Sequence, residues 1–146
     1  KWRFLQSFTR SIFLYRPKRF TIRADGRVVY KSKLLLATLG IGMYSGGGII
    51  SMPDAKFDDF LYDIIIVRMM PRFKMLRFLN NLKSGKLKDD EKLIRIRASV
   101  VEISSNPPSG IEIDGEALGM LPAKFSILPM SIRFVILKQD QHQSQQ

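Results

Sequence analysis

Residues Tyr62–Arg68 have the sequence YDIIIVR, in which four β-branched side chains follow one another without interruption. Isoleucine and valine lose side-chain freedom in a helix, whereas they pack well on the pleated surface of a sheet. A run of this composition is typical of a β-strand. We therefore predict that Tyr62–Arg68 forms a central strand of the fold.

The sequence before this strand contains a hairpin pattern. Phe20–Arg23 and Val28–Lys31 are rich in residues that favour strands, and Asp25–Gly26 between them is a signal for a tight turn. A further apolar stretch, Lys33–Leu39, predicts a buried strand. The chain therefore enters the fold through a β-hairpin and a further strand.

The sequence after the central strand predicts a helix and then a long alternating segment. Pro71 favours the start of a helix, because proline fits the first helical position, and Gly85 is a natural end. Lys92–Ser104 alternates between apolar and polar side chains, but the phase changes near Val100, which indicates a bulge. The apolar face of the helix is expected to contain Met75, Leu76, Leu79 and Leu82.

The two ends of the chain complete the pattern. Trp2–Phe13 has apolar side chains at helical spacing and predicts an amphipathic helix, whereas Lys138–Gln146 is polar and is expected to be a disordered tail. Many short strands with two helices and no linker predict one mainly β domain over residues 1–146, a β-sandwich. The remaining strands are predicted at Ile111–Ile113, Lys124–Leu128 and Ile132–Leu137.

The chain is strongly basic, with 24 Lys and Arg residues against 13 Asp and Glu residues and a formal net charge of +11. Such a balance favours an anionic partner, which could be nucleic acid, a phosphate compound or an acidic lipid surface. The aromatic side chains follow the periodicity of a core and do not alternate with lysine or arginine, as a base-stacking surface requires. We therefore expect an anionic membrane surface as partner and no nucleic acid.

The composition also bears on the compartment. Without cysteine the chain forms no disulfide and no thiolate metal site, which suits a reducing compartment. No apolar run approaches the ~20 residues that span a bilayer, and the charged, aromatic first residues do not resemble a signal peptide. We expect a cytoplasmic protein that is peripheral to the membrane.

Three polar motifs each allow a functional and a structural interpretation. The glycines Gly46–Gly48 let the backbone approach a ligand closely, or form a bulge. The pair Asp58–Asp59 offers oxygen ligands to Mg²⁺ or Ca²⁺, or bonds its own backbone in a turn. Glu116 follows the turn signal Asp114–Gly115, as a general base on a rigid turn or as part of a solvated hairpin. Spacing alone favours the structural interpretation of each motif.

The order of these motifs resembles the second domain of bacterial diacylglycerol kinases and related lipid kinases, with sphingosine kinases as distant relatives. The resemblance is carried by GGGIISMPDAKFDD at residues 46–59, IDGE at residues 113–116 and LPAKF at residues 121–125. It covers most of the chain, from about Arg16 to Leu137. It implies the β-sandwich, C-terminal domain of a bacterial transferase that acts in lipid metabolism and phospholipid biosynthesis.

The resemblance also implies a reaction, transfer of the γ-phosphoryl group of ATP to a lipid hydroxyl such as that of diacylglycerol. It implies that Glu116 is the general base, and that Asp59 binds a structural Mg²⁺ with the backbone carbonyls of Lys56 and Leu61 alongside. ATP would bind mainly to an N-terminal domain with a Gly-Gly-Asp-Gly-Thr motif, which these residues lack. That domain is the expected partner, and we expect this chain alone to be inactive.

The sequence departs from the family pattern after the aspartate pair, where the family usually has glycine and this chain has Phe60. If that glycine adopts a positive φ, phenylalanine is strained there. The metal loop would then be reshaped or empty, with Asp58 as a substitute ligand.

A second interpretation is a non-catalytic module that binds anionic lipid or a membrane surface. The net charge and the amphipathic Trp2–Phe13 segment motivate it. The apolar face of that segment could also drive formation of a homodimer, if the surface that it packs against is missing. Liposome binding that needs no nucleotide-binding domain would support this interpretation.

Overall fold

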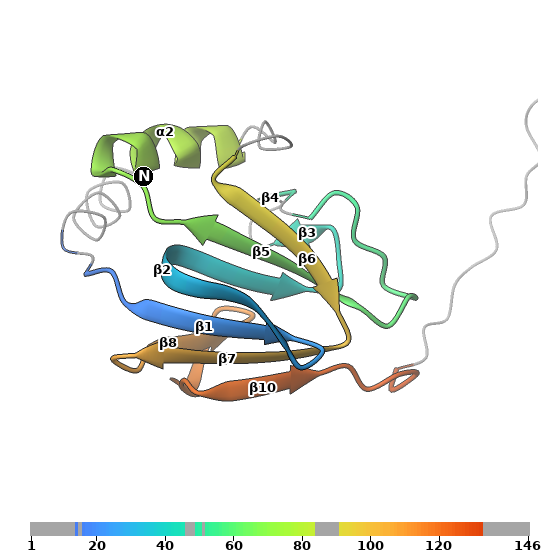
Figure 1. Ribbon diagram of the computed structural model, residues 1–146. Helices are drawn as coiled ribbons and strands as arrows, with labels where there is room; N and C mark the ends of the chain where they lie inside the picture. Colours follow the sequence, from blue (N-terminus) through green and yellow to red (C-terminus); the bar gives the residue numbers. More distant parts are fainter. Residues whose placement is uncertain (1–13, 15, 46–48, 51, 84–90, 133–146) are drawn as a thin grey trace, which may run out of the picture.

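The computed structural model describes residues 14, 16–45, 49–50, 52–83 and 91–132, and it is mainly β, as predicted (Figure 1). Six strands form one sheet in the order β10-β7-β1-β2-β5-β6, and two small sheets pair β3 with β4 and β8 with β9. The strands are β1 (Arg19–Ala24), β2 (Arg27–Gly40), β3 (Tyr44–Ser45), β4 (Ile49–Ile50), β5 (Tyr62–Arg68), β6 (Leu93–Ala98), β7 (Val100–Asn106), β8 (Gly110–Ile113), β9 (Glu116–Met120) and β10 (Ala123–Ser126).

The predicted first hairpin is confirmed by β1 and β2. Ala24 pairs with Arg27, so the loop between the strands has the two residues Asp25 and Gly26. Their φ angles are 46° and 80°. Positive φ at both central positions belongs to a type I′ turn, whose twist matches that of the two strands.

Strand β2 is longer than the sequence suggested. The separate strands predicted at Val28–Lys31 and Lys33–Leu39 are one strand, and this part of the prediction was wrong. The first part of β2 pairs with β1, the second part pairs with β5, and the register shifts between Leu34 and Leu36. The irregularity bends the strand, so β2 joins the two halves of the sheet.

Strand β5 is the central strand that the sequence predicted. It lies between β2 and β6, and it is covered on both faces. Ile64 and Ile66 point into the main core, whereas Ile65 and Val67 pack in a second core under the helix α2 (Arg72–Lys83). Burial on both faces explains why YDIIIVR does not alternate with polar residues.

The sheet folds over the main core at a corner between β6 and β7. Only Ser99 separates these strands, yet β6 pairs with β5 and β7 pairs with β1 and β10. The predicted change of phase near Val100 falls at this corner, but it marks the break between two strands and not the predicted bulge within one strand. Strands from both halves therefore face one core, whose fully buried side chains include Ile22, Leu34, Ile66, Ala98 and Val101.

The helix α2 confirms the prediction after Pro71. Met75 and Phe78 are buried against Val67 and Met70, so the helix covers the outer face of β5 (Figure 1). The predicted helix Trp2–Phe13, the tail Lys138–Gln146 and the strand Ile132–Leu137 beyond its first residue lie outside the described residues, as do the side chains of Leu76, Leu79 and Leu82.

Strands β8 and β9 form a second hairpin, and every residue of β9 is exposed. Ile113 pairs with Glu116 across a turn in which Asp114 and Gly115 have φ angles of 51° and 89°. The chain then returns to the main sheet, because Leu121 is buried and β10 pairs with β7. The strands predicted around residues 111–113 and 124–128 are thereby confirmed, the second with shifted ends.

Candidate functional site

The loop that leads into β5 carries the predicted metal residues. It starts at Met52, which is buried and whose Sδ atom lies 2.8 Å from where a Cβ on Gly40 would be. The Met52 carbonyl accepts a hydrogen bond of 3.0 Å from the Ala55 amide. The absence of a side chain at Gly40 thus lets the loop pack closely on the end of β2.

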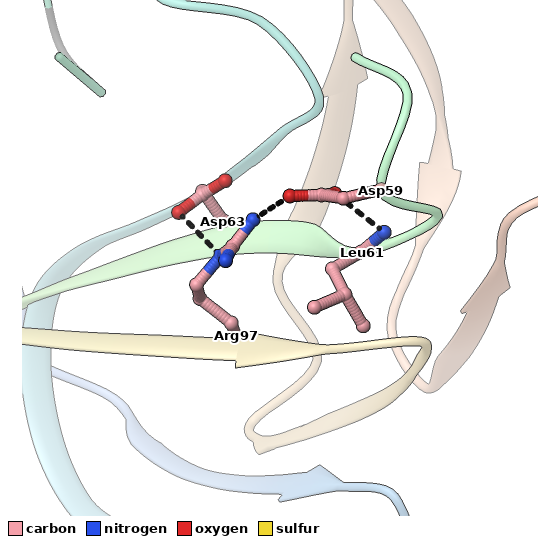
Figure 2. A network of polar contacts seen from close by, with 4 residues as sticks. All are labelled: Asp59, Leu61, Asp63 and Arg97. Carbon is pink, nitrogen blue, oxygen red and sulfur yellow. Dashed lines mark hydrogen bonds and ion pairs between the residues drawn. The ribbon is translucent and has the colours of Figure 1, made fainter. Parts of the chain in front are cut away.

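The end of this loop is held by Arg97, a residue that the sequence reasoning missed. Figure 2 shows the Arg97 guanidinium between two carboxylates. Its Nη2 forms an ion pair with Oδ2 of Asp59, and its Nε lies 3.3 Å from Oδ1 of Asp63. The Leu61 amide donates a 3.1 Å hydrogen bond to Oδ1 of Asp59. Both oxygens of Asp59 are therefore engaged by donors.

The pairing register of the sheet places Arg97 there. Asp63 on β5 lies directly opposite Arg97 on β6, and opposite charges at such positions attract. The alternation LIRIR at residues 93–97 already indicated that Arg97 shares the polar face of a strand. Only the register, however, shows which acidic residue faces it, and register depends on the whole sheet.

The pKa values of the two carboxylates shift in opposite directions. Burial alone raises the pKa of Asp59, but the Leu61 amide and the charges of Arg97 and Lys56 outweigh it, so that this pKa lies below its usual value. Burial raises the pKa of Asp63 more than Arg97 lowers it. Oδ2 of Asp63 is buried and has no hydrogen-bond partner among the described residues. Both oxygens of Asp59 thus have a donor, whereas one oxygen of Asp63 has none within the described residues.

Phe60, between Asp59 and Leu61, has the positive φ that the comparison with the family's glycine suggested. Phe60 has a φ of 57°, in the left-handed region, and its side chain is 47% exposed. A residue with a Cβ pays about 1–2 kcal/mol for this conformation. The strain expected for phenylalanine at this position is therefore present.

The Asp59 carboxylate, one of the three groups predicted for Mg²⁺, is occupied by Arg97 and does not fit the ion in this arrangement. Mg²⁺ requires near-octahedral oxygen ligands, and a neighbouring guanidinium repels it. The Leu61 amide occupies the other oxygen of Asp59, and the positive charge of Lys56 also acts on this carboxylate. Asp58, the proposed substitute, is exposed, and the described ranges contain no group of three His, Cys, Asp or Glu side chains placed around a metal. The metal site stays a prediction.

The predicted base, Glu116, is the first residue of β9, directly after the type I′ turn. Its side chain is exposed, so a substrate hydroxyl can reach it. Across the described part of the chain, no hydrogen bond or ion pair joins Glu116 to Asp59. The fold therefore keeps the two predicted functional residues on separate elements.

A basic surface on β1 and β2 is a further feature that the composition only suggested. Arg19 lies opposite Lys33, and Thr21 lies opposite Lys31, so these residues share one face of the sheet. Like charges at such positions repel each other unless an anion lies between them. A shallow hollow of about 370 Å³ beside them is lined by Thr21, Arg23, Glu102, Ile103, Ser104, Pro122, Ala123 and Lys124.

Known proteins of similar sequence are diacylglycerol kinases. The diacylglycerol kinase of Mycobacterium tuberculosis H37Rv is 29% identical over 118 residues, which is 81% of this chain and 38% of that protein. The diacylglycerol kinase of Staphylococcus carnosus is 32% identical over 111 residues, which is 76% of this chain and 36% of that protein. The chain thus spans less than half the length of these relatives.

Solved structures show the same fold. A diacylglycerol kinase structure from Bacillus anthracis matches 86% of this chain and 42% of its own, with a TM-score of 0.66 and 22% identity. A second structure from the same organism matches 84% of this chain and 40% of its own, with a TM-score of 0.67 and 26% identity.

A family model covers nearly the whole sequence. Described as the YegS C-terminal NAD kinase beta sandwich-like domain, it matches residues 1–136. This match agrees with the mainly β fold and with the similarity to diacylglycerol kinases. The chain therefore belongs to the YegS and diacylglycerol kinase family, as its C-terminal, NAD kinase beta sandwich-like domain.

Proposed function

We propose that the chain is the lipid-accepting part of an ATP-dependent lipid kinase, with a lipid hydroxyl such as that of diacylglycerol as acceptor. The observation that carries this proposal is the position of Glu116. It is exposed, and it follows directly a two-residue turn whose backbone is fixed by hairpin pairing. A carboxylate held in this way suits a general base that must meet a substrate from outside the domain.

In the proposed reaction Glu116 accepts the proton of the lipid hydroxyl while the hydroxyl oxygen attacks the γ-phosphorus of ATP. A bond forms between that oxygen and phosphorus, the bond from phosphorus to the β-phosphate oxygen breaks, and ADP leaves. ATP and the Mg²⁺ that neutralises its phosphates would bind mainly to a nucleotide-binding half, for which the additional length of the relatives leaves room. This half is the proposed protein partner.

A phosphate-transfer assay with labelled ATP and diacylglycerol tests this function. We expect transfer into lipid when the chain is joined to a nucleotide-binding half from the same protein, and none from the chain alone. Transfer by the chain alone would contradict the proposal that ATP binds mainly to the other half. If the joined protein transfers phosphate to no lipid alcohol, the proposed kinase function is wrong.

A second candidate function is non-catalytic binding to an anionic membrane, at the cytoplasmic side, and the basic surface of β1 and β2 favours it. Acidic headgroups would relieve the repulsion between Arg19 and Lys33. Within the described residues no helix is long and apolar enough to cross a bilayer. Contact through the charged sheet face therefore suits a peripheral association.

Vesicle co-sedimentation tests the membrane contact. Lys31→Gln combined with Lys33→Gln should weaken binding to phosphatidylglycerol vesicles and reduce its salt dependence, because two contacts with headgroups are lost. Arg72→Gln combined with Lys74→Gln removes the same charge from exposed positions on α2 and should have little effect. Equal losses in both double variants would mean that net charge alone drives binding.

A further inference from the structure

Asp59, Asp63 and Arg97 form a polar cluster at the start of β5 (Figure 2). The two carboxylates are only 22% and 15% exposed, and the guanidinium is 43% exposed. Two carboxylates that are largely shielded from water need a shared positive charge, because repulsion between them is poorly screened there. In this chain the charge comes from an arginine.

We propose that Arg97 takes the place of a divalent cation beside Asp59, and that it joins the loop of residues 52–61 to β5 and β6 without a metal. This inference concerns the architecture of the loop, and it holds whether or not the protein phosphorylates a lipid.

The geometry of the guanidinium suits this role. Its planar fork presents N–H groups on two edges, and here Nη2 meets Asp59 while Nε meets Asp63. A metal ion between two carboxylates would provide the same bridge between the loop and the strand. Because the bridge already exists, a second cation gains little from the site.

The loop also needs such an anchor. Phe60 is held at a φ of 57°, which the free chain would rarely adopt. Asp59 on one side is fixed by Arg97, and Leu61 on the other side is fixed through its amide to Asp59. The ion pair and this hydrogen bond together therefore hold the residues on both sides of Phe60.

Thermal unfolding of the 146-residue chain in millimolar Mg²⁺ and in EDTA tests the proposal. We expect the midpoint of the wild type to be the same in both solutions. Arg97→Gln should unfold at a lower temperature than the wild type, and Mg²⁺ should now raise its midpoint, because the oxygens of Asp59 and Asp63 become free for a metal. Arg77→Gln, which removes the same charge from an exposed position on α2, should behave like the wild type.

The proposal is wrong if Mg²⁺ raises the midpoint of the wild type, or if Mg²⁺ leaves Arg97→Gln unchanged. Should Arg97→Gln fail to fold, NMR spectra of the wild type with Mn²⁺ decide the question. Paramagnetic broadening confined to the signals around Asp59 and Asp63 would overturn the proposal, and its absence there would support it.

Discussion

The carboxylate of Asp25 accepts three hydrogen bonds from the corner that begins at Ser99, 74 residues further along the chain. The donors are the amide of Ser99 at 3.1 Å, its hydroxyl at 2.9 Å and the amide of Val100 at 2.9 Å. The Asp25 amide in turn donates to the Val100 carbonyl at 2.9 Å. The turn of the first hairpin thus fixes the corner between β6 and β7.

This relationship predicts a pH dependence of stability. The hydrogen bonds from Val100 and Ser99 lower the pKa of Asp25 from its usual 3.8 in spite of burial, which opposes the shift. The contribution of Asp25 to stability is therefore complete above the pKa of the unfolded chain, and it is lost as the pH falls through the lower pKa of the folded protein. Asp25→Asn should lower the unfolding midpoint at neutral pH and flatten its decline below about pH 4.

Asp114→Asn is the matched control, because Asp114 holds the same position in the other type I′ turn and no described residue donates a hydrogen bond to its carboxylate. Its acid profile should equal that of the wild type. If Asp25→Asn declines with acid as steeply as the wild type, Asp25 does not control the corner.

The central strand predicts a large effect in the main core. Ile66 has no exposed surface, so Ile66→Ala leaves a cavity and should reduce the free energy of unfolding by about 2–5 kcal/mol. Ile113 on the exposed hairpin is 44% exposed, and Ile113→Ala should cost only about 0.5 kcal/mol. Urea denaturation of the two variants measures the difference. Similar losses in the free energy of unfolding would show that Ile66 does not lie in the main core.

The strained loop residue predicts an unusual order of two substitutions. Phe60→Gly and Phe60→Ala both remove the ring, which is 47% exposed, but only glycine adopts a φ of 57° without strain. Relief of about 1–2 kcal/mol of strain exceeds the roughly 0.5–1 kcal/mol by which glycine favours the unfolded chain, so Phe60→Gly should be the more stable of the two by about 0.5–1 kcal/mol in denaturant unfolding. At Phe57, which lies in the same loop without a positive φ, alanine should be the more stable replacement. If alanine is also the more stable replacement at Phe60, Phe60 is unstrained.

Features that depend on neighbours in sequence could be predicted from the sequence. The turn at Asp25 and Gly26 follows from residues that tolerate positive φ, and the strand Tyr62–Arg68 follows from its β-branched run. The helix after Pro71 could be predicted from the proline and from the spacing of the apolar residues that follow it. These signals are local, so the remainder of the fold does not change them.

Features that depend on distant contacts could not be predicted. The sequence gives no sign that β2 continues through residues 32–33, because the bend is imposed by pairing with β1 on one side and with β5 on the other. Arg97 likewise gains its role only from its position opposite Asp63. Glu116 was identified through the order of motifs, and its role stays a prediction.

The central claim is tested most directly by the Glu116→Gln variant of the protein that joins this chain to its nucleotide-binding half. The measurement is the rate of phosphate transfer to diacylglycerol. Loss of a general base should reduce turnover by about 10²–10⁴-fold, while the unfolding midpoint stays that of the wild type. Glu112→Gln, on the same exposed hairpin, should retain full turnover. If Glu116→Gln turns over as fast as Glu112→Gln, Glu116 is not the base, and the proposed mechanism is wrong.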